Sequence, residues 1–164
     1  MAQEAAFVDA SPLIGLAYVG GLAWLPRLYG AAFVTRTVRD EVLSGRGLAG
    51  ESEIRRALKR KHLRLLRRNL VEPEFPDLDG GEASTLRAAL GHGEGALVVI
   101  DDLAARQAAR ALKLVFTGTA GVILEARRAG LIDAARPVFE QLAQTDFRLS
   151  SRIVEEILAE LGER

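Results

Sequence analysis

The sequence predicts an α/β fold, and three observations support this prediction. Short apolar runs alternate with stretches of helical periodicity, which favours parallel βαβ units arranged in three layers. The clearest run, residues 96–100, holds five apolar side chains between Gly95 and Asp101, as expected for a strand buried on both faces. With 164 residues and no internal repeat, the chain has the length of about one domain. We therefore expect one domain over residues 1–164.

Four strands are expected, each followed by a helix. The strands are residues 7–8 with their flanking alanines, 31–34, 96–100 and 113–116. Ser11 is predicted to cap the first helix, with Pro12 at its first position, and Thr35 to cap the helix 36–43. Further helices are expected at 22–29, 83–90, 103–112, 122–129, 131–143 and, at the C-terminal end, about 151–162.

Residues 51–68 are predicted to form a longer amphipathic helix, followed by a linker loop at 69–79. Its inward side would carry Ile54, Leu58, Leu65 and Leu66. Its outward face would be strongly basic, with Arg55, Arg56, Lys59, Arg60, Lys61, Arg64, Arg67 and Arg68. This face is interpreted as a track for phosphates, and the alternatives are a solvated surface or a patch for an acidic protein partner.

The composition excludes several classes of protein. The 22 basic and 22 acidic residues give a formal net charge of zero, which argues against binding nucleic acid through overall charge alone. No cysteine is present, so there is no disulfide framework and no cysteine-based zinc site. The longest near-apolar run, residues 13–25, is too short to span a bilayer, and no secretory signal is visible at the N-terminus. We expect a cytoplasmic protein without membrane contact.

Acidic residues follow two of the expected strands. Asp9 follows the first strand, and Asp101 and Asp102 follow the strand at 96–100. Ligands of open α/β sheets bind outside the carboxyl ends of the strands, so these positions favour a functional site. Helix capping is the simpler explanation, but a single Asp is enough to cap the helix 103–112. The second acid is then unexplained.

Two glutamates also lie at the borders of apolar helix faces. Glu41 lies on the edge of its helix's buried stripe, and the alternative is a surface carboxylate paired with Arg36 or Arg39. Glu82 lies on the apolar face of the first turn of its helix, where desolvation is unfavourable without a nearby cation. Its alternative role is a favourable interaction with the helix dipole.

If these carboxylates converge, they require bound cations, because uncompensated carboxylates repel one another. Mg²⁺ and Mn²⁺ are the natural partners, since both prefer oxygen ligands and leave coordination positions for water and phosphate. Such ions can activate a water for in-line attack at phosphorus.

The order of these motifs resembles that of PIN domains. The matching segments are Asp9-Ala-Ser11, Val38-Arg-Asp-Glu-Val42, Gly81-Glu82-Ala83 and Ile100-Asp-Asp102. The sequence is most similar to a PIN-like subset with GEA, DD, AR and GTxG motifs, which here are Gly81–Ala83, Asp101–Asp102, Ala105-Arg106 and Gly118–Gly121. The resemblance covers residues 7–149, which is most of the chain.

This resemblance implies a three-layer α/β/α sandwich with a central, mainly parallel sheet of about four to five strands. It also implies a Mg²⁺- or Mn²⁺-dependent nuclease and often a homodimer; many PIN proteins are VapC-like toxins that cleave RNA and bind a cognate antitoxin. The matching acids, as catalytic residues and metal ligands, are Asp9, Glu41, Glu82 and Asp102, with Asp101 as an additional candidate ligand. Glu82 stands where many members carry Asp, which lengthens that ligand by one methylene. Ser11 and Thr119 match supporting polar positions.

The leading hypothesis is therefore a metal-dependent endoribonuclease, with RNA phosphates contacted by Arg55, Arg56, Lys59 and Arg60. The alternative is a catalytically silent PIN-like module that binds other proteins. A hydrolase acting on a small phosphorylated molecule is a third hypothesis, but the expected nucleophilic Asp with a downstream Lys is not evident.

Overall fold

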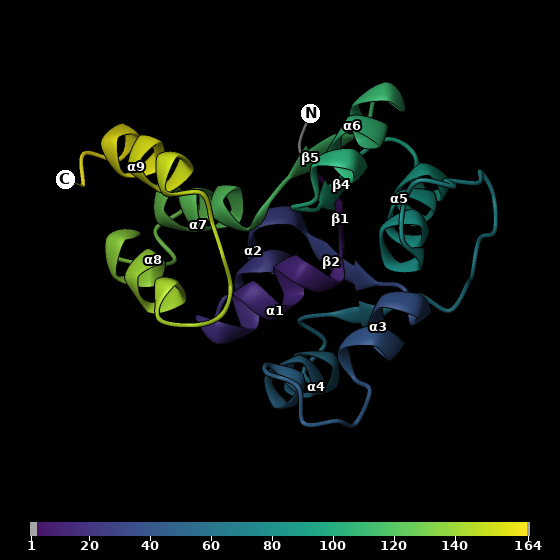
Figure 1. Cartoon of the computed structure of the whole chain (residues 1–164), viewed down its shortest axis with the longest axis horizontal. Coiled ribbons are helices and arrows are strands. Elements are labelled where there is room, and N and C mark those ends of the chain that lie inside the picture. Colours follow the sequence, from purple (N-terminus) through teal and green to yellow (C-terminus); the bar gives the residue numbers. More distant parts are fainter. Residues whose placement is uncertain (1–2, 164) are drawn as a thin grey trace.

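A five-stranded parallel sheet forms the centre of the computed structural model, which describes residues 3–163 (Figure 1). The strands are β1 (Ala5–Val8), β2 (Ala31–Val34), β3 (Arg64–Leu65), β4 (Ala96–Val99) and β5 (Val115–Thr117). Their order across the sheet is β3-β2-β1-β4-β5. Strands β2 and β3 therefore extend the sheet on one side of β1, and β4 and β5 extend it on the other. The predicted parallel α/β sheet is confirmed.

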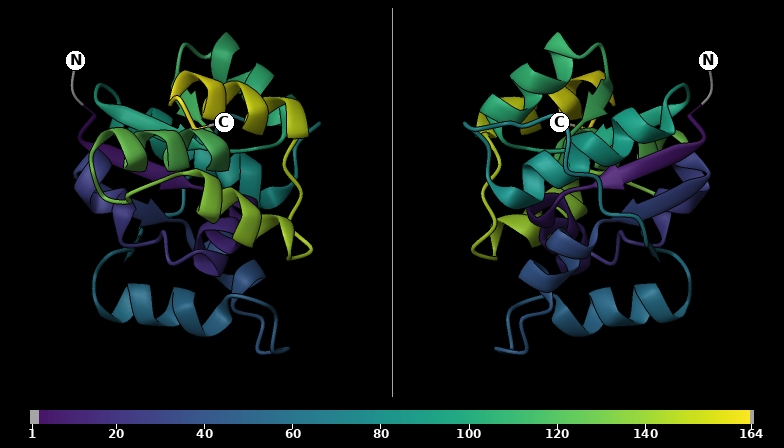
Figure 2. Two further views of the ribbon diagram at one scale, coloured as in Figure 1. Left: turned by 90° about the vertical axis from the view of Figure 1, so that its left-hand side faces the viewer. Right: turned by 90° about the vertical axis from the view of Figure 1, so that its right-hand side faces the viewer.

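Helices cover both faces of this sheet. Their bounds are α1 (Ala10–Tyr18), α2 (Trp24–Tyr29), α3 (Arg36–Val42), α4 (Glu51–Lys59), α5 (Gly80–His92), α6 (Leu103–Ala111), α7 (Thr119–Arg128), α8 (Arg136–Ala143) and α9 (Ser151–Glu160). Helices α1, α2 and α7 pack on one face, and α5 and α6 pack on the other (Figure 1). Figure 2 shows α4 at the outer end of the molecule, next to α1. Within residues 3–163, no helix is long and apolar enough to cross a bilayer.

Successive residues of β1 point to opposite faces and fill two separate cores. Ala6 and Val8 pack with the α1, α2 and α7 side, whereas Ala5 and Phe7 pack against α5 and α6. A strand covered on both faces can be apolar at every position, which explains why the short runs in the sequence do not alternate. The three-layer α/β/α arrangement follows directly.

The predicted helix over residues 51–68 is wrong in its second half. Helix α4 ends at Lys59, and Lys61 adopts a left-handed backbone conformation with a φ of 60°. Leu63, two residues after Lys61, is 1% exposed. Its burial turns the chain back toward the sheet, where Arg64 and Leu65 form β3 beside β2. Burial of Leu63 thus ends the helix at a point that helical periodicity alone does not predict. The eight basic residues therefore do not share one helix face.

The start of the first helix also differs from the prediction. Helix α1 begins at Ala10, directly after β1, and its N-cap is Asp9 rather than Ser11. The carbonyl of Asp9 accepts a hydrogen bond from the backbone N–H of Leu13. Pro12 still lies in the first turn, where its missing N–H leaves no hydrogen bond unmade. The Asp9 side chain makes no capping hydrogen bond and is free for another role.

Candidate functional site

The carboxyl ends of β1 and β4 open into a cavity of about 360 Å³. Its lining is acidic, and no Lys, Arg or His is among the described residues that line it. The acids are Asp9, Glu41, Asp79, Glu82, Asp101 and Asp102. Every acidic residue proposed from the sequence therefore faces this one cavity, together with Asp79, which was not predicted to lie there.

Strand pairing brings the first of these carboxylates beside the pair on β4. Val8 is the register partner of Val99, and the backbone N–H of Asp9 donates to the Val99 carbonyl at 3.0 Å. Asp9 is 6% exposed and is the one buried carboxylate of the described residues. A buried, unpaired carboxylate at the carboxyl edge of a parallel sheet is positioned for a ligand rather than for solvent.

Asp101 and Asp102 are adjacent in sequence but differ in their contacts. Asp101 accepts hydrogen bonds from the Thr119 N–H and the Thr119 hydroxyl, both at 2.8 Å. The exposed hydroxyl of Ser11 donates to the same carboxylate at 3.4 Å. Asp102 instead caps α6, since one of its oxygens, Oδ1, accepts from the Ala105 N–H at 2.9 Å. Thr119 therefore contacts the site through Asp101, whereas Ser11 also lines the cavity itself.

Replacing Thr119 by Val is expected to destabilise the protein by roughly 1.5–3 kcal/mol, because the buried Thr119 hydroxyl donates to a charged acceptor. Ser11→Ala removes a longer, exposed hydrogen bond to the same carboxylate and should change stability by less than about 0.5 kcal/mol. Urea unfolding of both variants measures the difference. Equal effects would contradict this account of how Asp101 is held.

Helices α3 and α5 bring Glu41 and Glu82 to the cavity, and Gly81 allows their close approach. A Cβ atom at Gly81 would lie 2.8 Å from Glu41 Oε2 and 3.3 Å from Asp9 Oδ1. These distances are shorter than ordinary van der Waals contact, so the carboxylates occupy the space a side chain would need. Gly81 is therefore part of the geometry of the acidic cavity.

We expect Gly81→Ala to leave the fold within about 1 kcal/mol of the parent, since alanine favours the helix, but to displace the Glu41 carboxylate. Mn²⁺ affinity, measured by calorimetry, should fall about tenfold. Gly80→Ala is a matched control in the same turn, because its Cβ would meet only Thr37 at an ordinary 3.5 Å. The idea fails if both alanines affect Mn²⁺ equally.

Asp79 and Glu82 form a capping box at the start of α5. The Glu82 N–H donates to Asp79 Oδ1 at 2.8 Å, and the Asp79 N–H donates to Glu82 Oε2 at 3.1 Å. The pattern of an acid followed three residues later by Glu is visible in the sequence and could have identified Asp79 as the cap. Its position in the acidic cavity could not be read from that pattern.

Crowding of the acids changes their protonation. The pKa of Asp9 is raised from 3.8 to about 7, mainly by burial and also by the nearby carboxylates of Asp79, Glu82 and Glu41, although a hydrogen bond from the Ala10 backbone lowers it in part. Desolvation also raises the pKa values of Glu41 and Glu82, with the Asp79 charge contributing to both. Near neutral pH the cavity thus holds negative charge that the surrounding protein does not compensate.

The donor set fits a hard divalent cation. Carboxylate oxygens are the ligands that Mg²⁺ and Mn²⁺ prefer, and added positive charge would favour the ionised form of Asp9, which burial and the neighbouring carboxylates disfavour. Among residues 3–163, however, no three acidic or histidine side chains stand as ready ligands around a single point. Glu82 and Asp102 are each held on one oxygen at a helix N-terminus, and the other oxygen of each carboxylate is left for a ligand.

The predicted RNA-binding residues lie apart from this cavity. Three of them are on α4 and Arg60 is its C-cap, and none of the four lines the acidic cavity. Two are engaged by acids of their own helix, since Arg55 pairs with Glu51 and Arg56 with Glu53. The structure therefore does not bring Arg55, Arg56, Lys59 and Arg60 together with the acidic site.

The sequence profile of the family described as PIN domain matches residues 5–163. The chain belongs to the PIN-domain family. No curated protein matches the sequence. PIN domains are generally nucleases that act on nucleic acid and typically use divalent metal ions. In this PIN domain the acidic cavity lies at the carboxyl edge of the sheet, where open α/β folds bind their ligands.

Proposed function

We propose that this PIN domain is a metal-dependent endoribonuclease whose Mg²⁺ or Mn²⁺ is held by Asp9, Glu41, Glu82 and Asp102. The observation that carries the proposal is the convergence of six carboxylates in one cavity whose described lining contains no cation. Such a cavity is electrostatically unfavourable by itself and suits a bound divalent ion. RNA is preferred as the substrate because the sequence motifs resemble those of PIN ribonucleases.

The four proposed ligands differ in how firmly the protein holds them. Asp9 is buried at a strand end and offers a fixed carboxylate. Asp102 is fixed through Oδ1 by its cap to α6, which leaves Oδ2 for a ligand. Glu41 is exposed and reaches the cavity from α3. We assign Asp101 a positioning role, because Thr119 donates to both of its oxygens.

A bound Mg²⁺ or Mn²⁺ supplies positive charge for the phosphodiester and makes a water more acidic for attack at phosphorus. The chain's own residues then have two tasks. The carboxylates hold the ion in place. Without the ion, their negative charge repels a phosphate from the cavity. The capping box and the Asp101–Thr119 hydrogen bonds hold the helix starts that carry these acids.

The test is cleavage of a single-stranded RNA with Mn²⁺ and with EDTA, using the parent protein and Asp102→Asn. Asn caps helices as well as Asp does, so the variant should fold normally while Mn²⁺-dependent cleavage falls at least about tenfold. Asp40→Asn is the control, because Asp40 is exposed, pairs with Arg39 and does not line the cavity.

Absence of Mn²⁺ binding and of cleavage in the parent protein would favour the silent interaction module instead. A toxin role with a cognate antitoxin and a homodimer stay predictions from the family resemblance. RNA contacts through Arg55, Arg56, Lys59 and Arg60 and a cytoplasmic location stay predictions from the sequence. A gene for a small DNA-binding protein next to this one would favour the toxin role.

A further inference from the structure

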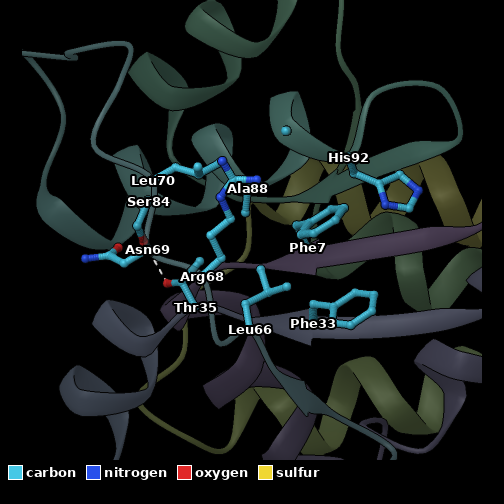
Figure 3. A pocket seen from close by; sticks show the side chains of 11 residues that line it. Phe7, Phe33, Thr35, Leu66, Arg68, Asn69, Leu70, Ser84, Ala88 and His92 are labelled. Carbon is cyan, nitrogen blue, oxygen red and sulfur yellow. Dashed lines mark hydrogen bonds between the residues drawn. The ribbon is translucent and has the colours of Figure 1, made fainter.

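A second cavity, of about 210 Å³, lies on the α5 side of the sheet (Figure 3). Its floor is aromatic, because Phe7 of β1 and Phe33 of β2 stack with ring centroids 5.5 Å apart and planes at 19°. Leu66 and Leu70 add apolar walls, and the His92 ring contacts Phe7 with centroids 5.6 Å apart. This volume is below the roughly 300–1,000 Å³ of typical drug-sized pockets and suits one planar group.

The cavity exists because the helices leave part of this face uncovered. The core on this side is formed with α5 and α6, and it includes β1 and β4 as buried strands. Phe7 is 2% exposed, but Phe33, its register partner on β2, is only partly buried. Over β2 the face is bordered by the segment after β3 rather than by a third helix. An aromatic surface on β2 is therefore accessible.

The charge of this cavity is opposite to that of the acidic cavity. Arg68 and His92 lie on its rim, both exposed, and no Asp or Glu is among its described lining residues. Asn69, also exposed, adds an amide with donors and an acceptor. Aromatic rings beside a cation are the features that bind bases of single-stranded nucleic acid, because bases stack on the rings while the cation contacts phosphate.

Hydrogen bonds at the start of α5 connect the surroundings of the two cavities. Thr35 and Ser84 line the second cavity, and their hydroxyls are hydrogen-bonded at 2.7 Å (Figure 3). The Ser84 hydroxyl also donates to the Gly81 carbonyl, and Gly81 is the residue that packs against Asp9 and Glu41. A nucleic acid strand with a phosphate at the acids would thus have its neighbouring nucleotides close to the aromatic floor.

We propose that this cavity binds one base of single-stranded RNA, stacked on Phe33, with Arg68 contacting an adjacent phosphate. The inference rests on the proposed function for its choice of RNA as the ligand. It adds a subsite outside the carboxylates, on the α5 face of the sheet rather than at its carboxyl edge. The subsite would fix where a flexible strand enters and which phosphate reaches the acids.

The test is binding of a fluorescein-labelled adenylate hexamer, followed by anisotropy in EDTA, beside a hexamer of ribose phosphates that lacks bases. The parent protein should bind the base-bearing hexamer about tenfold more tightly. Phe33→Leu keeps the apolar volume but removes the aromatic face, so this preference should largely disappear. Because neither metal nor cleavage is needed, the result is independent of catalysis by the acids.

Arg68→Gln is the second variant, and Arg67→Gln is its matched control, since Arg67 is an exposed neighbour outside the cavity lining. Arg68→Gln should weaken hexamer binding several-fold more than Arg67→Gln and should reduce its salt dependence by about one phosphate contact. Equal effects of the two variants would overturn the proposal.

Equal affinity of the parent protein for the two hexamers would also overturn it. The cavity would then be assigned to an apolar side chain of a protein partner. Displacement by AMP at the concentration at which the hexamer itself binds would assign the site to a free nucleotide rather than to RNA.

Discussion

Asp9→Asn is expected to reduce Mn²⁺-dependent RNA cleavage at least about 10²-fold while leaving the protein folded. Substitutions next to metal ligands already cost 10–100-fold in affinity or activity, and Asp9 is the buried, central carboxylate of the proposed set. The carboxylate is unfavourable where it lies, since burial raises its pKa to about 7. At pH 8 the Asn variant should therefore unfold at the same temperature as the metal-free parent or a higher one. Loss of function with retained stability separates a site residue from a structural one.

The matched control for this experiment is again Asp40→Asn, which makes the same chemical change on the exposed side of α3. It should retain parental cleavage. The preparation must show no cleavage without metal. If Asp9→Asn then cleaves RNA at the parental rate, Asp9 is not a catalytic residue, and the proposed metal site loses its central ligand.

The second large effect is on stability against pH. In EDTA, the free energy of unfolding of the parent should fall by roughly 4 kcal/mol as the pH rises from about 3 to about 8, relative to Asp9→Asn. The sign follows from proton binding. Between the unfolded pKa of 3.8 and the folded pKa of about 7, the folded state binds the proton and the unfolded state does not. Raising the pH therefore favours unfolding.

Mn²⁺ should reverse this loss at pH 8, because it binds the ionised carboxylates of the folded protein. At a hundred times its dissociation constant, the ion stabilises the folded state by about 2.7 kcal/mol. Urea titrations of the parent and of Asp9→Asn, each with EDTA and with Mn²⁺, measure all four combinations. A difference between the two proteins that does not change with pH would show that the Asp9 carboxylate titrates normally.

The sequence predicted the central part of the fold well. The run at 96–100 is apolar throughout because β4 is buried on both faces, and the acids that follow it mark the end of the strand. The two-residue strand β3 could not be predicted in this way. Its sequence continues the helical pattern of α4, and only the burial of Leu63 in the folded core shows where the helix must end.

The candidate site was predictable in its members but not in its contacts. Strand order alone places Asp9 beside Asp102, since β1 and β4 are neighbours. The different positions of Asp101 and Asp102 depend on Thr119, which is 18 residues further along the chain than Asp101. Similarly, Asp79 reaches the cavity only because α5 packs against α3, a contact that no local pattern encodes.

The short outer strands of the sheet also limit how copies of this protein can associate. At one edge β3 is two residues long and presents the exposed Arg64, and at the other β5 is three residues long. Long, flat, uncharged edges recruit strands from other molecules, whereas short or charged edges resist this. Neither border of the sheet offers a template for a continuous intermolecular sheet. Self-association of this chain is therefore expected to place helix against helix.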